Sequence, residues 1–138
     1  MRVFLDTNVL LDSILERENP QFFEDAATIL DMGRDGTLKL YMSILSVPTI
    51  AYVIKNVNST GKRAIIQILT SIVEVLPALP EHVPEMLESP LQDIEDALQL
   101  LSARSGGCEL IVTRDVEGFR LSEIPVITPA DLLSRILE

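Results

Sequence analysis

Apolar residues along the chain follow two spacings, short continuous runs and repeats of three or four, which predict strands and helices in alternation. The runs predict five short strands, at Arg2–Leu5, Leu38–Met42, Val73–Leu76, Glu109–Thr113 and Pro125–Ile127. The helical spacing predicts helices over 8–16, from Pro20 to 33–36, over 45–57, from Ser59 or Thr60 onward, over 91–104 and from 128–129 onward, with one short helix in the proline-rich stretch 77–90.

Strands that alternate with helices indicate a parallel sheet covered by helices on both faces. The expected fold class is therefore α/β, with three layers (α/β/α) and a central, mostly parallel sheet of about five short strands. The chain has 138 residues, no internal repeat and no linker-like stretch, so we expect one domain over residues 1–138.

The composition excludes several classes of protein. Hydrophobic residues make up 47% of the chain, which excludes disorder for most of it. The single cysteine, Cys108, excludes an internal disulfide, and one Cys with one His excludes a Cys/His zinc site. That one histidine, His82, lies in a proline-rich turn and is expected at the surface. No secretory signal is visible, and no apolar run reaches the roughly 20 residues that cross a bilayer. We expect a soluble protein of the reducing cytoplasm, with no membrane contact.

Charge is unevenly distributed along the chain. The formal net charge is −10, with 21 acidic and 11 basic residues, which argues against tight, unaided nucleic-acid binding. Residues 36–73, however, contain no Asp or Glu, although Lys39, Lys55, Lys62 and Arg63 fall there. This segment either faces a phosphodiester or is an apolar segment that carries few charges, and the sequence leaves both interpretations open.

Carboxylates gather where the predicted strands end, which is where open parallel sheets bind ligands. Asp6 ends the first strand, Asp115 follows the fourth, and Asp93 and Asp96 begin the helix before the fourth. Converging carboxylates raise one another's pKa unless a cation lies among them, and oxygen ligands select Mg²⁺ or Mn²⁺ over zinc. Such a site suits phosphodiester hydrolysis. No glycine-rich phosphate loop is present, which argues against a nucleotide cofactor.

Three segments resemble the signature segments of PIN-domain proteins: LDTNVLLD (5–12), DALQLLSA (96–103) and LIVTRDVEGF (110–119). The closing stretch IPVITPADLL (124–133) resembles the end of bacterial PIN domains of the VapC toxin kind. The resemblance implies a Mg²⁺- or Mn²⁺-dependent endoribonuclease, often the toxin of a toxin–antitoxin pair. It also implies a homodimer, and an antitoxin protein that places a cationic side chain in the acidic pocket.

Carried over by position, the resemblance implies that Asp6 and Asp96 hold the metal and that Asp115 completes the site, directly or through water. Asp93 either joins these ligands or caps its helix. Asp12 and Glu95 are expected to be solvated helix residues. Thr113 and Asn8 either orient the carboxylates by hydrogen bonds or are satisfied turn residues.

The sequence departs from the family's pattern on the helix after the second strand. PIN ribonucleases usually carry a Glu there, but the corresponding position falls near Thr49 or Tyr52. Because a hard dication gains much of its binding from ligand charge, the loss should weaken the site. Either Asp93 replaces this Glu, or the activity is reduced.

Two interpretations of function follow. In the first, the chain is a metal-dependent endoribonuclease, with RNA phosphates bound by Lys55, Lys62, Arg63 and Arg114. In the second, it is a PIN-fold module with little catalysis that binds RNA or a protein partner. A phosphatase is disfavoured, because Asp6-Thr7-Asn8 lacks the second carboxylate of a DxD motif.

Overall fold

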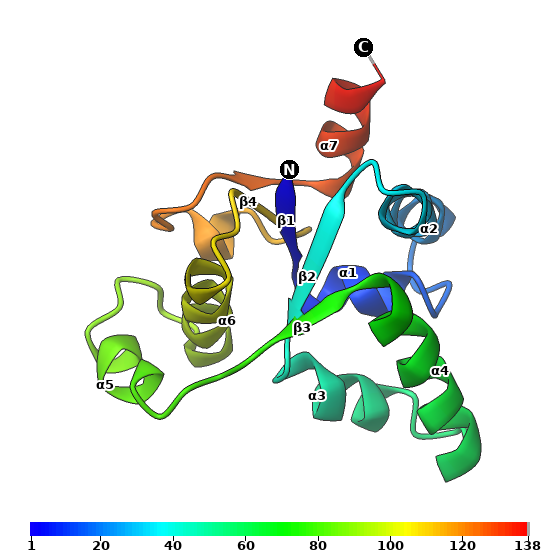
Figure 1. The fold of residues 1–138 in the computed structure, drawn as a ribbon, viewed down its shortest axis with the longest axis horizontal. Coiled ribbons are helices and arrows are strands. Elements are labelled where there is room, and N and C mark those ends of the chain that lie inside the picture. The colour runs from blue at the N-terminus through cyan, green and yellow to red at the C-terminus, as the bar shows by residue number, and fades with distance from the viewer. Residues whose placement is uncertain (138) are drawn as a thin grey trace.

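The computed structural model describes residues 1–137, whose five strands form one parallel sheet in the order β3-β2-β1-β4-β5 (Figure 1). The strands are β1 (Arg2–Leu5), β2 (Lys39–Ser43), β3 (Glu74–Leu76), β4 (Leu110–Val112) and β5 (Val126–Ile127). All four strand pairs are parallel. The predicted fold class is therefore confirmed, and the sheet is entirely rather than mostly parallel.

Helices connect the strands in the predicted order. They are α1 (Thr7–Asp12), α2 (Pro20–Arg34), α3 (Ser46–Val53), α4 (Ser59–Ile72), α5 (His82–Leu87), α6 (Ile94–Ser105) and α7 (Pro129–Ile136), with a short 3-10 helix, η1 (Glu117–Phe119). None of the helices in residues 1–137 is both long and apolar enough to span a membrane.

Polar side chains set several helix ends. Asn19 accepts a hydrogen bond from the backbone of Gln21 and precedes Pro20, as predicted for the start of α2. Thr128 caps α7 in the same way. Asn58, rather than Ser59 or Thr60, caps α4. Helix α6 begins at Ile94 instead of residue 91, because the side chain of Asp93 caps it.

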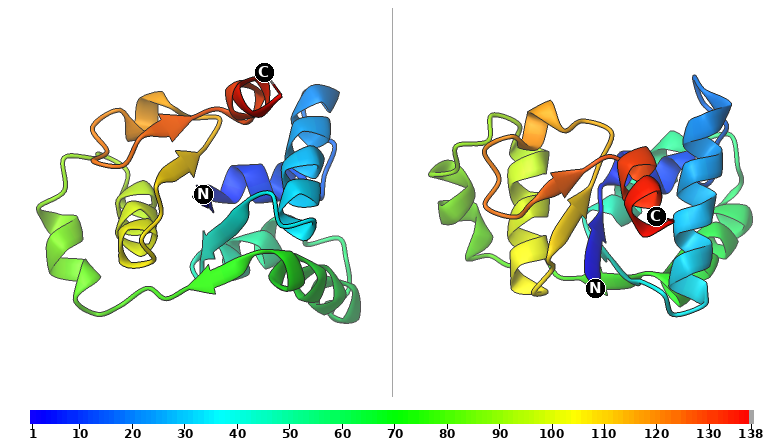
Figure 2. Two further views of the ribbon diagram at one scale, coloured as in Figure 1. Left: turned by 45° about the horizontal axis from the view of Figure 1, so that its top comes forward. Right: turned by 90° about the horizontal axis from the view of Figure 1, so that it is seen from above.

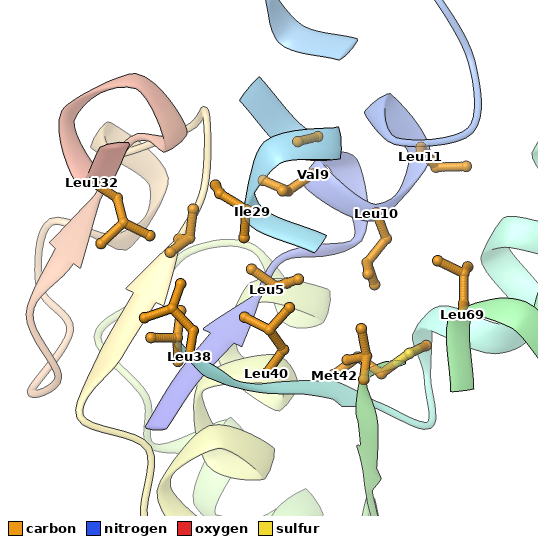
Figure 3. Packing of buried hydrophobic residues seen from close by; sticks show 14 of the residues in the cluster. Leu5, Val9, Leu10, Leu11, Ile29, Leu38, Leu40, Met42, Leu69 and Leu132 are labelled. Atoms are coloured by element: carbon orange, nitrogen blue, oxygen red, sulfur yellow. The ribbon is translucent and has the colours of Figure 1, made fainter. Parts of the chain in front are cut away.

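The two faces of the sheet bury different side chains, as expected for strands covered on both sides. Val3, Leu5 and Leu40 point to the face covered by α1, α2, α4 and α7 (Figure 3). Phe4 and Ile111 point to the opposite face, against α6 and η1. Helix α7 lies against α2, so it completes the helical layer on the α2 face of the sheet (Figure 2).

The register of the central strands places the ends of β1 and β4 side by side. Leu5 lies opposite Val112, and the backbone N–H of Asp6 donates to the carbonyl of Val112 over 3.0 Å. The residues that follow these two strands, Asp6 and Thr113, therefore leave the sheet together.

Candidate active site

The candidate site lies at the carboxyl ends of β1 and β4, beside the start of α6 (Figure 1). Asp6 follows β1, Asp115 follows β4, and Asp96 lies in the first turn of α6. The three carboxylates, together with Asp93 and Glu95, interact electrostatically, since the other four raise the pKa of Asp96. The topology thus brings together the acids that the sequence singled out.

Asp6 is the buried member of the group, with 3% of its surface exposed. Its Oδ1 accepts a hydrogen bond from Nε2 of Gln99 over 3.0 Å, and its Oδ2 accepts one from Oγ1 of Thr113 over 2.8 Å. Burial raises the pKa of Asp6, although both hydrogen bonds lower it. The carboxylate is therefore fixed in orientation by two donors from different segments.

Gln99 is a site residue that sequence reasoning missed. It is 1% exposed, and while Nε2 donates to Asp6, its Oε1 accepts from the backbone N–H of Thr7 over 3.3 Å. The hydroxyl of Thr7 lies 2.6 Å from that of Ser46, which is also buried and begins α3. The only signal in the sequence was a polar residue three positions after Asp96, among apolar helix residues.

Thr113 links Asp6 to Asp115. Its hydroxyl donates to Asp6 and accepts from the backbone N–H of Asp115 over 3.0 Å. Of the two interpretations of Thr113, the structure supports the orienting one. Asn8, by contrast, is exposed.

Gly118 closes the turn in which Asp115 lies. Its N–H donates to Oδ1 of Asp115 over 3.0 Å. A Cβ at this position would lie 2.4 Å from Oδ2 of Asp115 and 3.1 Å from Oδ2 of Asp96. The two carboxylates therefore face the same space beside the glycine, and any side chain at position 118 would displace one of them.

A cavity of about 370 Å³ opens above these groups. Its charged lining consists of Asp93, Asp96, Asp115 and Glu117, with Arg120 as the one cation. Arg120 pairs with Glu117 over 3.3 Å. Within residues 1–137, none of Asp6, Asp93, Asp96 and Asp115 forms an ion pair with a basic side chain. Negative charge in the cavity is thus left largely uncompensated.

Asp96 responds most strongly to this charge. Burial raises its pKa to about 7, and the carboxylates of Asp93, Asp6, Asp115 and Glu95 contribute to the rise. A cation among these groups would reverse the effect, because it favours the ionised form.

The donor chemistry fits a hard divalent cation, since every charged ligand is a carboxylate. In residues 1–137, however, no three His, Cys, Asp or Glu side chains are grouped closely enough to hold a metal ion. The two oxygens of Asp6 already accept hydrogen bonds, and the pair facing one space is Asp96 and Asp115. The site therefore has the ligand type that a divalent cation prefers, but not a complete set of coordinating side chains.

Asp93 and Glu95 flank Asp96 on the first turn of α6. Asp93 uses Oδ1 to cap the helix, accepting from the backbone N–H of Asp96 over 2.9 Å. Glu95 is exposed, as expected, yet it lies close to Asp6. Burial raises the pKa of Glu95, the carboxylates of Asp6 and Asp93 raise it further, and the side chain of Thr7 lowers it.

Helix α3 contributes no acid to the site. The hydroxyl of Thr49 donates to the carbonyl of Leu45, and Tyr52 is 74% exposed. What α3 supplies is Ser46, through its contact with Thr7.

Two expectations about single residues are wrong. Asp12, expected to be solvated, is 1% exposed, and it is paired with Arg114 and Arg17. His82, expected at the surface, is buried, and its Nδ1 is satisfied there by the backbone N–H of Leu79 over 3.0 Å. Cys108 is buried as well, and burial raises the pKa of its thiol to about 11, so it is not an activated nucleophile.

The basic residues expected to contact RNA fall into two groups. Lys55 follows α3, and Lys62 and Arg63 lie near the start of α4, which covers the face of the sheet opposite to α6. Arg114 is not with them, because its guanidinium pairs with Asp12 and Glu18 and lies over the ring of Phe22.

Comparisons with known proteins identify a matching family and a similar sequence. The model of the family described as PIN domain matches residues 2–117. The chain is similar to Ribonuclease VapC1 of Aquifex aeolicus (strain VF5), with 29% identity over 140 residues that cover 97% of this chain and 94% of the relative.

Solved structures share the fold. The chain is similar to one in the VapBC2 complex from Rickettsia felis bound to a promoter DNA fragment, with a TM-score of 0.67, 13% identity, and coverage of 93% and 98% of the two chains. It is also similar to a chain of VapBC-1 from nontypeable Haemophilus influenzae, with a TM-score of 0.64, 18% identity, and coverage of 94% and 99%.

The raised pKa of Asp96 predicts how the metal-free protein responds to pH. The folded state holds this proton up to about pH 7, whereas the unfolded chain releases it near its ordinary value of 3.8. The contribution of Asp96 to stability is therefore full below about pH 4 and is lost as the pH rises to about 7. We expect the melting temperature in a chelator to fall by a few degrees more in the wild type than in Asp96→Asn over this range. Glu24→Gln, on the exposed side of α2, should keep the wild-type slope, and an equal slope in Asp96→Asn would contradict the expectation.

Proposed function

The chain belongs to the PIN domain family, and on that premise we propose that it is a divalent-metal-dependent endoribonuclease, the toxin of a toxin–antitoxin pair. The observation that carries the proposal is the convergence of Asp6, Asp96 and Asp115 without a compensating cation. Phosphodiester cleavage is the chemistry to which an oxygen-lined divalent site is suited.

The relatives support both parts of the proposal. The curated relative is named a ribonuclease, and it aligns with this chain over nearly the full length of both. A solved structure with the same fold is a toxin–antitoxin complex from Klebsiella pneumoniae. An antitoxin with a cationic side chain would match the acidic cavity by charge. We include in the proposal that the toxin is a homodimer, as the family resemblance implies.

Asp6, Asp96 and Asp115 are the residues that would hold Mg²⁺ or Mn²⁺. When bound, such an ion lowers the pKa of water and neutralises charge on the phosphate and the leaving oxygen. Gln99 and Thr113 keep both oxygens of Asp6 in one orientation, and Gly118 holds Asp115 toward the cavity. The cavity of about 370 Å³ gives a phosphate room beside Asp96 and Asp115.

The fourth carboxylate of the site comes from α6 rather than α3. Asp93 and Glu95 are the two candidates, and each raises the pKa of Asp96. Asp93 lines the cavity, but one of its carboxylate oxygens already accepts the hydrogen bond that caps the helix. Glu95 is the acid that interacts with Asp6. Either one adds the charge that α3 lacks.

RNA phosphates are assigned to Lys55, Lys62 and Arg63. Arg63 and Lys55 are exposed, and Lys62 is partly exposed. Arg114 does not belong to this group, since its guanidinium already has two carboxylate partners and is 22% exposed.

A second candidate function is a binding module of the same fold with little catalysis. Two observations favour it: the absence of an acid on α3, and the absence of a three-carboxylate group in residues 1–137. The two candidates differ in whether the protein binds a divalent cation and cleaves RNA.

Asp96→Asn distinguishes these candidates. We expect the wild type to bind Mn²⁺ by calorimetry and to cleave RNA, and the variant to lose at least about 100-fold in both, the upper end of the cost of changing an outer-shell group. Glu24→Gln changes the net charge equally on the exposed side of α2 and should behave as the wild type. A wild type that neither binds Mn²⁺ nor cleaves RNA would establish the binding module instead.

Asp93→Asn and Glu95→Gln identify the fourth carboxylate. If Asp93 is the ligand, Asp93→Asn should cost as much cleavage as Asp96→Asn, and Glu95→Gln should cost less than about tenfold. The opposite order assigns Glu95. The cap of α6 survives in Asp93→Asn, because Asn is as good an N-cap as Asp. Near-normal cleavage by both variants would mean that three carboxylates suffice.

Lys62→Gln combined with Arg63→Gln tests the RNA contacts. Each phosphate contact to a single strand contributes about 0.7 to the slope of log K against log salt, so the double variant should flatten the slope by about 1.4. Binding is measured in a chelator by fluorescence anisotropy. Lys39→Gln with Arg135→Gln removes the same charge at the opposite end of the sheet and should leave the slope unchanged. If both double variants flatten the slope equally, the effect is one of net charge alone.

A further inference from the structure

A group of charged side chains surrounds Asp12, at the end of α1. Asp12 is 1% exposed, and both its oxygens are engaged. Oδ2 accepts from Nε of Arg114 over 2.7 Å, and Oδ1 accepts from the terminal nitrogens of Arg114 and Arg17 over 3.4 and 3.2 Å. The pair with Arg114 therefore joins residues 102 positions apart in the chain.

Arg114 stands between two residues of the site, Thr113 and Asp115. Its guanidinium lies 4.3 Å from the ring centroid of Phe22 on α2 and 3.4 Å from Glu18. The backbone of Thr113 is still held by the sheet, since its N–H donates to Ile127 over 3.0 Å. After Thr113 the chain leaves β4, and the next contact that holds it is the one between the side chain of Arg114 and Asp12.

Stability alone does not explain this arrangement. Removing the Asp12 carboxylate from water costs free energy that an ion pair recovers only with good geometry, and apolar residues of similar volume often serve as well. Here the geometry has a defect, because Nε of Arg17 is buried without a hydrogen-bond partner. Glu18 moreover has a φ of 49°, in the left-handed region. These features make sense if the position of Arg114 matters in itself.

We propose that the Asp12–Arg114 ion pair is a positioning device for the active site. It fixes the turn that leaves β4, so that the Thr113 hydroxyl meets Asp6 and the Asp115 carboxylate faces Asp96. Arg114 is then a positioning residue that acts through its two neighbours, without touching RNA or metal. This inference rests on the proposed function for its effect on cleavage, but its effect on the turn does not depend on that function.

Arg17 offers a matched control. Like Arg114, it donates to Asp12, so Arg114→Met and Arg17→Met each remove one cation from the same buried carboxylate. Arg17, however, lies in the connection before α2, and within residues 1–137 its side chain has no hydrogen bond or ion pair with a residue of the site. A purely structural ion pair predicts lower stability in both variants with an unchanged turn, whereas a positioning pair predicts a changed turn in Arg114→Met alone.

The two variants are compared by amide hydrogen exchange at Asp115 and Gly118, by Mn²⁺ affinity and by RNA cleavage. In Arg114→Met we expect faster exchange at these amides, whose hydrogen bonds define the turn. We also expect Mn²⁺ affinity and kcat to fall by about 10–100-fold, as for outer-shell residues, with little change in KM for RNA. Arg17→Met should melt earlier but match the wild type in exchange at the turn, in Mn²⁺ affinity and in kcat.

A third variant keeps the test decisive if Arg114→Met unfolds. Asp12→Leu combined with Arg114→Met and Arg17→Met removes the whole charge group and should restore stability, yet exchange at the turn should stay fast and kcat low. Normal exchange and normal kcat in this folded triple variant, or equal effects of Arg114→Met and Arg17→Met on exchange, Mn²⁺ affinity and kcat, would overturn the positioning role. A wild type that neither binds Mn²⁺ nor cleaves RNA would overturn the proposed function instead, while exchange at Asp115 and Gly118 would still decide whether Arg114 holds the turn.

Discussion

Electrostatic repulsion among carboxylates at one edge of the sheet is the constraint on which the arrangement of the candidate site depends. Parallel strands deliver the residues after β1 and β4 to the same edge, and α6, the helix that precedes β4, starts there. Asp6, Asp96 and Asp115 consequently lie near one another, and their mutual repulsion adds to the effect of burial in raising the pKa of Asp96 to about 7. A fold selected for stability alone would keep these acids apart or pair them with basic residues.

The surrounding residues hold the acids in place without neutralising them. Gln99 and Thr113 satisfy the oxygens of Asp6 as neutral donors, so they fix its direction and leave its charge available. Gly118 does the same for Asp115 through a backbone N–H. The cations close in sequence are used elsewhere, since Arg114 pairs with Asp12, an acid outside the cavity. Arg120, the one cation in the lining of the cavity, is paired with Glu117, so within residues 1–137 Asp93, Asp96 and Asp115 keep their charge unpaired.

The order of strands and helices could be predicted from the sequence, because hydrophobic periodicity is local information. The acids of the site could be found by the rule that ligands bind at the carboxyl ends of parallel strands. Gln99 and Asp12 could not, since their roles depend on partners about a hundred positions away. Gln99 contacts Asp6 and Asp12 contacts Arg114, each across the sheet or between layers. On a helix, a buried polar residue looks the same in sequence as a solvated one until its partner is known.

The carboxylates of the site differ in how firmly they are held, and this difference bears on how a cation would enter. Asp6 is buried and has two donors, whereas Asp96 is partly exposed and is oriented by no side-chain donor in residues 1–137. Asp96 and Asp115 line the cavity, and Asp6 does not. A cation arriving from solvent would therefore meet Asp96 and Asp115 first, and the buried Asp6 would attract it through a carboxylate of fixed orientation. Asp6, next to the sheet, therefore has a fixed orientation, whereas Asp96 lies in the first turn of α6 and has no such donor in residues 1–137. Because that turn also carries Asp93 and Glu95, the helix that closes the site can supply the charge that α3 lacks.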